Sequence, residues 1–160
     1  MTDPDRIEAA LAAIPTPVAA LTVAKGNERN GMTVSWFAPV SKDPPLLMVA
    51  VRNDRYTRKL IEEARYFVVN VYAEDQANRV GAFKLVGPDR ERKFDGLDVG
   101  RDDWGQPFVR DSAAVLHCRL ERTVSDGDHT MFVGKVLDAE IRETTPMTTL
   151  SLGKGYDGIR

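Results

Sequence analysis

The chain has 160 residues and a formal net charge of −2 at pH 7, with acidic and basic residues interleaved. This pattern gives no broad basic surface for nucleic acid or for an anionic membrane. The longest apolar runs are far shorter than the roughly 20 residues needed to span a bilayer, and the first ten residues lack the basic and apolar regions of a signal peptide. We therefore expect a single domain over residues 1–160, located in the cytoplasm, without a nucleic acid or membrane partner.

Cys118 is the only cysteine, which excludes an intrachain disulfide, a thiolate zinc cluster and a Cys-x-x-Cys redox pair. Its apolar neighbours at alternate positions predict a buried and inert thiol. The two histidines, His117 and His129, have no carboxylates nearby at metal-ligand spacing, so we predict no metal site. Any redox chemistry must then come from a bound cofactor.

The first residues predict a short helix followed by a hairpin. Asp3 is suited to cap the helix, Pro4 to its first position, and Pro15 to end it. Apolar residues at helical spacing form one stripe on this helix: Ile7, Ala10, Leu11 and Ile14. Residues 18–24 then read as a strand, and the polar residues 25–31 as a hairpin loop into an antiparallel partner.

The stretch 30–45 alternates from Met32 onward and predicts a single half-buried strand. One face carries Met32, Val34, Trp36, Ala38 and Val40, and the other carries Thr33, Ser35, Phe37 and Ser41. The second face has small hydroxyls and an aromatic ring but no charge before Lys42. It therefore suits a planar, partly polar ligand, while the alternative is an ordinary strand of a β core.

Residues 46–51 are apolar on both faces, which predicts a central strand covered on each side. The next segment, 52–64, has helical spacing, with Asp54 as a plausible cap. Its inner face consists of Tyr56, Leu60, Ile61 and Ala64.

The start of this helix carries basic and polar side chains beside unpaired backbone N–H groups: Asn53, Arg55, Thr57 and Arg58. Such a helix start is a candidate anion site, and phosphate is the anion we expect. The alternative is that these arginines are merely solvated.

Further strands are expected over 66–72, 113–121 and 129–141, a helix over 75–85, and a long polar loop over 86–107. Asn70 lies among apolar neighbours and is either bonded to backbone or turned toward a ligand. His117 falls on the polar face of its strand, and His129 is either a turn residue or a catalytic one. The last 15 residues should pack on the barrel or on a second subunit.

Several strands at hairpin spacing with few helices predict a mainly β fold, a small and mostly antiparallel barrel. The order and spacing of several segments resemble the flavin reductase-like family, whose members fold as FMN-binding split barrels. These segments are PTPVAALTV, NGMTVSWFAPVSKDPP, RYTRKLI with YFVVNVY, KFDGL, GDHTMFVGKV and LGKGY. The resemblance runs from about residue 15 to residue 155.

The resemblance implies two groups of flavin-binding residues and one catalytic residue. The isoalloxazine ring would rest, largely through backbone groups, on Thr33, Val34, Ser35 and Trp36, with Ser41 nearby. The phosphate would be held by Arg52, Asn53, Thr57 and Arg58. His129 would lie beside the flavin or the incoming nicotinamide. Members are commonly homodimers with the cofactor near the interface, which would give the segment around Tyr156 a partner.

The function that follows is an NAD(P)H-dependent flavin reductase, in which NADH or NADPH reduces bound FMN and electrons pass to a flavin or to a partner such as a monooxygenase. One alternative is an electron-transfer module without a nicotinamide site. Another is a barrel of the same shape that binds a deazaflavin or haem. The sequence leaves open the choice between NADH and NADPH, between FMN and FAD, and between bound and exchanged flavin.

Overall fold

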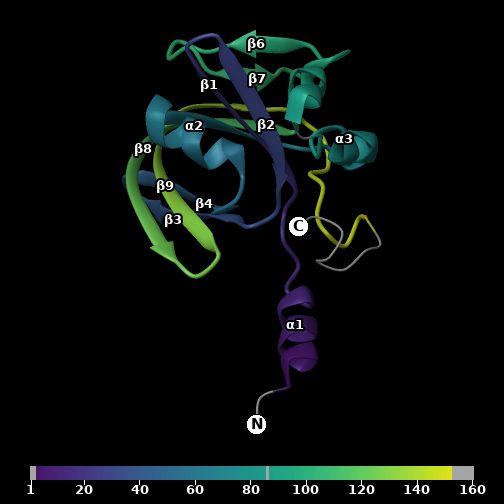
Figure 1. Cartoon of the computed structure of the whole chain (residues 1–160). Helices are drawn as coiled ribbons and strands as arrows, with labels where there is room; N and C mark the ends of the chain where they lie inside the picture. Colours follow the sequence, from purple (N-terminus) through teal and green to yellow (C-terminus); the bar gives the residue numbers. More distant parts are fainter. Residues whose placement is uncertain (1–2, 86, 153–160) are drawn as a thin grey trace.

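Seven antiparallel strands form one sheet that curls into a barrel (Figure 1). The computed structural model describes residues 3–85 and 87–152. The strand order is β2-β1-β5-β8-β9-β4-β3. The bounds are β1 (Ala19–Lys25), β2 (Glu28–Val34), β3 (Phe37–Lys42), β4 (Pro45–Arg52), β5 (Tyr66–Val71), β8 (Ala114–Asp126) and β9 (His129–Ile141). A separate hairpin consists of β6 (Val99–Arg101) and β7 (Pro107–Val109).

Three α-helices and two 3₁₀ segments accompany the strands: α1 (Pro4–Ala12), α2 (Tyr56–Ala64), η1 (Glu74–Gln76), α3 (Ala77–Ala82) and η2 (Gly87–Phe94). Helix α2 packs against β1, β2, β4 and β5 and places Leu60 and Ile61 in the barrel core. Its predicted inner face is therefore confirmed. Helix α1 projects away from the barrel (Figure 1) and has no buried residue. Within the described residues, no helix has the length and apolar character needed to cross a bilayer.

The barrel interior is filled by side chains from both ends of the sheet. Its fully buried members include Leu21, Val49, Val51, Phe67, Val69 and Phe132. A second apolar cluster lies between β1, α3 and η2 and contains Tyr72, Phe83 and Phe94. The two clusters cover both faces of β1, which explains why six of its seven residues are buried.

The N-terminal predictions are confirmed with one change. Asp3 caps α1 through hydrogen bonds from the backbone N–H groups of Asp5 and Arg6, and Pro4 is the first helical residue. The β1–β2 hairpin is present, but the predicted seven-residue loop is wrong. Only Gly26 and Asn27 form the turn, because Gly26 adopts a φ of +61° that permits a tight reversal.

The single strand predicted from Met32 onward is also wrong. Strand β2 ends at Val34, and β3 begins at Phe37 on the opposite side of the sheet order. Alternation would place Val34 and Phe37 on different faces, yet both lie in the same core cluster. The break at Ser35 and Trp36 rotates the chain, so a hydroxyl-lined second face does not continue along the whole stretch.

Strand β4 is not the central strand that its apolar sequence predicted. It lies second from one end of the sheet, between β3 and β9, and β8 is the central strand. The inner side chains of β4 are buried, while Leu46, Met48 and Ala50 on the outer face are only half-buried. The outside of this part of the barrel is therefore apolar without being fully covered.

The segment predicted as a long loop, 86–107, contains η2 and most of the β6–β7 hairpin. Short elements with few apolar residues give a weak periodicity signal, which is why the sequence did not show them. Asn70 anchors this hairpin, because its amide donates to the Ala20 carbonyl and the Thr22 hydroxyl and accepts from the Val109 N–H. The structural interpretation of Asn70 is confirmed.

The C-terminal segment packs on the barrel as far as it is described. Pro146 pairs with Ala73 and Thr148 pairs with Pro17 in isolated bridges, and Met147 is fully buried. The predicted segment around Tyr156 lies outside the described residues.

Gly134 provides a test of how tightly the barrel is packed. A Cβ at this position would lie 2.7 Å from the Phe67 ring and 2.9 Å from Cβ of Cys118. Gly134→Ala should therefore lower the free energy of unfolding by about 1–3 kcal/mol in urea titrations. Gly81→Ala is the matched control, because a Cβ at this exposed α3 position meets no atom within 4 Å and should leave stability equal or higher. Equal stability of Gly134→Ala and the native chain would contradict this packing.

Candidate functional site

The break between β2 and β3 brings Trp36 beside His129 at the start of β9. The two ring centroids are 4.7 Å apart with an interplanar angle of 44°. The Trp36 carbonyl accepts from the Ala50 N–H at 2.8 Å, which fixes the break against β4. On β4, Arg52 pairs in register with His129. Trp36, Arg52 and His129 line a groove of about 590 Å³ together with Asp128 and with Pro4, Ile7, Glu8 and Leu11 of α1. We call it the Trp36–His129 groove.

His129 is oriented by its neighbour. Its Nδ1 lies 2.7 Å from Oδ1 of Asp128, so Nδ1 carries a proton that the carboxylate accepts. This hydrogen bond lowers the pKa of Asp128 below its ordinary value. A neutral His129 then has its Nε2 as the remaining acceptor, which suits a residue that orients a ligand.

The residues that the resemblance assigned to the isoalloxazine ring differ in what their side chains contact. The Thr33 hydroxyl donates to the Val80 carbonyl at 3.1 Å and lies 3.2 Å from the Tyr72 hydroxyl. Val34 belongs to the barrel core. A ligand at this strand end would therefore meet backbone groups, as the resemblance implied, together with Ser35 and Trp36. Ser41 lies at the far end of β3 from Trp36.

Arg52 and Asn53 precede the start of α2, and Arg52 lines the groove. Arg52 donates to Asp54 at 3.0 Å. The Asn53 amide donates to the Gly127 carbonyl and accepts from the Thr130 hydroxyl, so it ties this loop to the β8–β9 hairpin. The predicted Asp54 cap is wrong: the N-cap is Arg55, without a side-chain hydrogen bond, because Asp54 pairs with arginine instead.

Thr57 and Arg58 belong to the first turn of α2. The Thr57 hydroxyl is buried and accepts from the Asn30 amide at 3.1 Å. Arg58 lies 3.3 Å from Glu62, one helical turn further on. Thr57 therefore connects the helix start to strand β2, while Arg58 lies along the helix surface.

Lys93 is the residue of this region that the sequence interpretation missed. Its side chain comes from η2, and the residue is only 5% exposed. The ammonium group donates to Oδ1 of Asn30 at 3.0 Å and to the Gly31 carbonyl at 2.6 Å. Both acceptors are neutral, and within residues 3–85 and 87–152 no carboxylate pairs with it. The only sequence signal was its place in the KFDGL segment of the resemblance.

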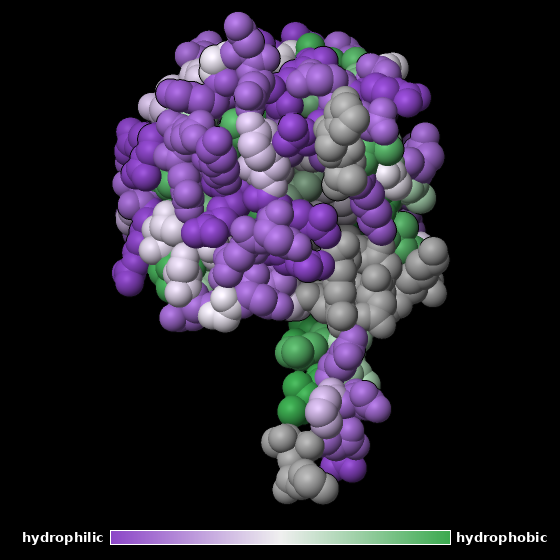
Figure 2. Space-filling model, in the orientation of Figure 1, coloured by the Kyte–Doolittle hydropathy of each residue, from purple (hydrophilic) through white to green (hydrophobic). Residues whose placement is uncertain are grey.

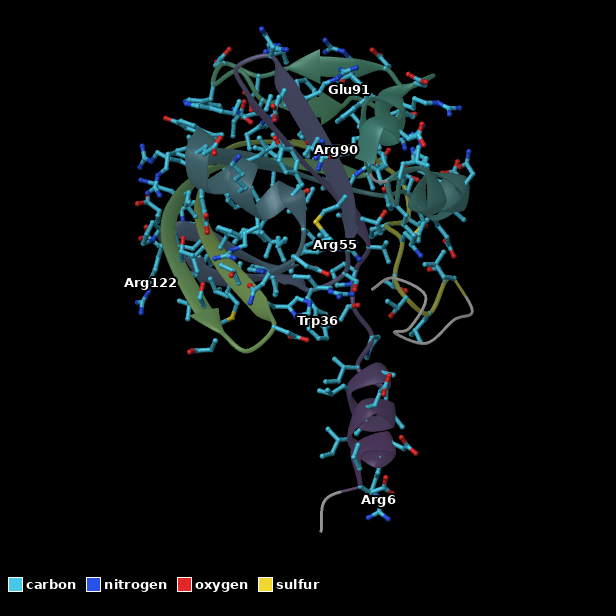
Figure 3. All side chains as sticks on the ribbon, viewed as in Figure 1. Arg6, Trp36, Arg55, Arg90, Glu91 and Arg122 are labelled. Carbon is cyan, nitrogen blue, oxygen red and sulfur yellow. The ribbon has the colours of Figure 1, made fainter. Side chains whose placement is uncertain are left out.

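The surroundings of Lys93 are unfavourable for its charge. The pKa of Lys93 is lowered to about 8, mainly because burial disfavours the charged form. The nearby cations Arg90 and Arg55 contribute to the same shift. Figure 3 labels Arg55 and Arg90 on the barrel side above Trp36. A buried ammonium without an anionic partner is costly, and an anion bound there would relieve the cost. Lys93 and the N-terminus of α2 therefore lie together at the candidate anion site, to which the sequence prediction had assigned Asn53, Arg55, Thr57 and Arg58 but not Lys93.

The other histidine and the cysteine have structural roles. His117 is buried with its Nδ1 2.8 Å from Oδ2 of Asp102, in contact with the Phe108 ring. The face predicted to be polar is not solvated at His117, because the β6–β7 hairpin covers this residue. Cys118 is buried, and burial raises its pKa to about 12, which confirms the inert thiol. In the part of the chain that is described, no three His, Cys, Asp or Glu side chains gather as a metal site would need.

The fold and these two regions define a class of protein: a split β-barrel with a candidate anion site beside Asn30 of β2 and an aromatic groove where the same strand ends. Comparison with known proteins agrees with this class. The family model of the flavin reductase like domain matches residues 11–160. The chain belongs to this family, and the predicted FMN-binding split-barrel type is confirmed.

Individual relatives cover most of the chain. FMN reductase (NADH) SmoA of Agrobacterium fabrum is 35% identical over 86% of this chain and 77% of its own. The flavin-dependent monooxygenase reductase subunit HsaB of Rhodococcus jostii is 32% identical over 91% and 73%. The solved NADH:FAD oxidoreductase SgcE6 of Streptomyces globisporus, in complex with NAD and FAD fragments, has 30% identity and a TM-score of 0.82 over 92% of this chain and 90% of its own.

The lowered pKa of Lys93 predicts a pH dependence of stability in the ligand-free protein. Between the native value of about 8 and the ordinary value of 10.5, the unfolded state binds more protons than the native state. The free energy of unfolding should therefore rise with pH across this window, by an amount on the order of a few kcal/mol at most. Urea titrations at several pH values measure this rise. Lys93→Met removes the titrating group, so the rise attributable to it should vanish; identical pH profiles would contradict the assignment.

Proposed function

We propose that this chain is an NADH-dependent flavin reductase that binds FMN across strand β2 and passes electrons to a flavin or to a monooxygenase partner. The observation that carries the proposal is the placement of two complementary sites along one strand. The anion site meets β2 at Asn30 and Gly31, and the groove begins where β2 ends. Four residues at roughly 3.3 Å each separate Asn30 from Val34 by about 13 Å.

This arrangement suits a ligand with a phosphate at one end and a flat ring at the other. The phosphate would lie against Lys93, Thr57 and the first N–H groups of α2, with Arg55 and Arg58 adding positive charge. The ring would lie along Thr33, Val34, Ser35 and Trp36. Arg52 and Asn53 remain candidates for the phosphate, and Ser41 for the ring.

When bound, FMN would accept a hydride and pass on electrons, so the chain itself needs no set of acid–base residues. The role of the protein side chains is to hold the two rings in position. Trp36 and His129 offer aromatic surfaces against which a second ring can be held close to the first. Asp128 keeps the His129 imidazole in one tautomer, and the groove walls exclude part of the water.

The names of the relatives support the choice of reductant and acceptor. SmoA and SgcE6 are named for NADH, and HsaB is the reductase subunit of a flavin-dependent monooxygenase. By similarity we extend NADH as the reductant and a monooxygenase as the acceptor to this chain.

The homodimer is also part of the proposal. The outer face of β4 and β9 carries half-buried apolar side chains in adjacent positions, Met48 beside Val133 and Ala50 beside Met131, and Val40 on β3 is exposed. A contiguous apolar face of this kind is typical of protein interfaces. It adjoins the Trp36–His129 groove, so a second subunit there would place the cofactor near the interface.

Removal of the buried ammonium tests the phosphate site. Lys93→Met should weaken FMN binding by about 10- to 100-fold, because a charge-assisted hydrogen bond is lost. Riboflavin has the same ring without the phosphate, so its affinity should change little. Flavin fluorescence titrations measure both. An equal loss for FMN and riboflavin would show that Lys93 supports the fold of the site rather than the phosphate.

The role of His129 is tested by separating binding from electron transfer. His129→Ala should slow the bleaching of bound FMN by NADH about 10- to 100-fold, while FMN affinity stays within a few-fold. Anaerobic stopped-flow absorbance gives the rate, and titration gives the affinity. A collapse of FMN affinity with an unchanged rate would overturn the role.

If neither NADH nor NADPH bleaches the native protein, the electron-transfer module without a nicotinamide site is the better description.

A further inference from the structure

Helix α1 provides one wall of the Trp36–His129 groove. Pro4, Ile7, Glu8 and Leu11 line it on the helix side, and Trp36, Arg52, Asp128 and His129 line it on the barrel side. A volume of about 590 Å³ lies within the range of small-molecule sites. The family model begins at residue 11, so most of α1 lies outside the matched region.

Within residues 3–85 and 87–152, no element buries the apolar stripe of α1. Ile7 is 49% exposed, Leu11 48% and Ile14 58%. Figure 2 shows hydrophobic residues along one side of the projecting helix. Isolated helices shorter than about 12–15 residues are marginal in water, and α1 has nine residues. A ligand placed between α1 and the barrel would bury part of this stripe and hold the helix in place.

The chemistry of the two walls selects the ligand. The barrel wall offers the Trp36–His129 aromatic pair with Arg52 and with Asp128, which is bonded to His129, while the helix wall offers the branched side chains of Ile7 and Leu11 beside Glu8. Such a site fits a molecule with a flat heteroaromatic ring and an attached phosphate. The proposed FMN is anchored through its phosphate at Lys93, on the other end of β2, which leaves this outer wall for the second substrate.

We propose that α1 is a positioning element for the reductant, in which Ile7 and Leu11 pack on the nicotinamide half of a reduced nicotinamide dinucleotide and hold it against Trp36 and His129. The inference rests on the proposed function and adds to it a specificity element outside the barrel. Arg52 then faces the pyrophosphate of the dinucleotide rather than the phosphate of FMN.

The test uses the whole 160-residue chain loaded with FMN and compares two variants of the same stripe. The double variant Ile7→Ser/Leu11→Ser removes the apolar surface that lines the groove. Ile14→Ser is the matched control, because Ile14 continues the stripe but does not line the groove. Anaerobic stopped-flow over a range of NADH concentrations separates the apparent dissociation constant from the limiting rate of flavin bleaching.

The double variant should raise the apparent dissociation constant for NADH about tenfold. Its FMN affinity and its sedimentation behaviour should match those of the native chain, and Ile14→Ser should resemble the native chain throughout. An equal effect of both variants, or none, would overturn the inference. So would a change confined to the oligomeric state, which would show that a second copy of the chain covers the stripe.

These outcomes are distinct from a failure of the proposed function. That failure would appear in the native chain itself, as absent FMN binding or as bound FMN that NADH does not bleach. Native activity with unaltered NADH kinetics in the double variant would instead leave the flavin reductase intact and remove only the role of α1.

Discussion

The arrangement of the whole barrel depends on the short connection between β2 and β3. These strands are consecutive in the chain, yet they are the first and last members of the seven-stranded order. In a flat sheet, six intervals of about 4.8 Å would separate them by roughly 29 Å. Three residue steps from Val34 to Phe37 span at most about 11 Å. The sheet must therefore curl until its ends approach, and β2 does come close to β4.

The same connection creates the groove. A regular strand would have turned Trp36 and Val34 to one face, but the break leaves Val34 in the core and Trp36 beside His129. The candidate anion site lies nearer the other end of β2, where Asn30 is shared between Thr57 and Lys93. One strand thus holds both ends of the proposed flavin. The buried ammonium of Lys93 opposes stability in the ligand-free protein, and the proposed phosphate would offset this cost, so the proposal links folding to ligand binding through one group.

Sequence reasoning proposed those site residues whose signals are local. The start of α2 was identified as an anion site from the residues around Thr57, and His129 was identified at the start of its strand. Lys93 was missed because it lies 36 positions beyond Thr57 in a segment that looks like a polar loop. Its burial results from η2 packing on β2, and the segment has no periodicity that would predict this contact. The burial of His117 on its polar strand face was missed for the same reason, since the covering hairpin is also formed by weakly patterned residues.

The amino-acid sequence by itself determined the elements whose signals are short-range. These are the capped helix α1, the β1–β2 hairpin, the amphipathic helix α2 and the strand β9, together with the resemblance that named the family. Only the tertiary structure decided which strands are neighbours, where the chain breaks between β2 and β3, and which polar side chains are buried. Alternation and capping depend on residues a few positions apart. Strand order and the burial of Lys93 depend on contacts between segments that are distant in the chain, and a linear pattern does not record these.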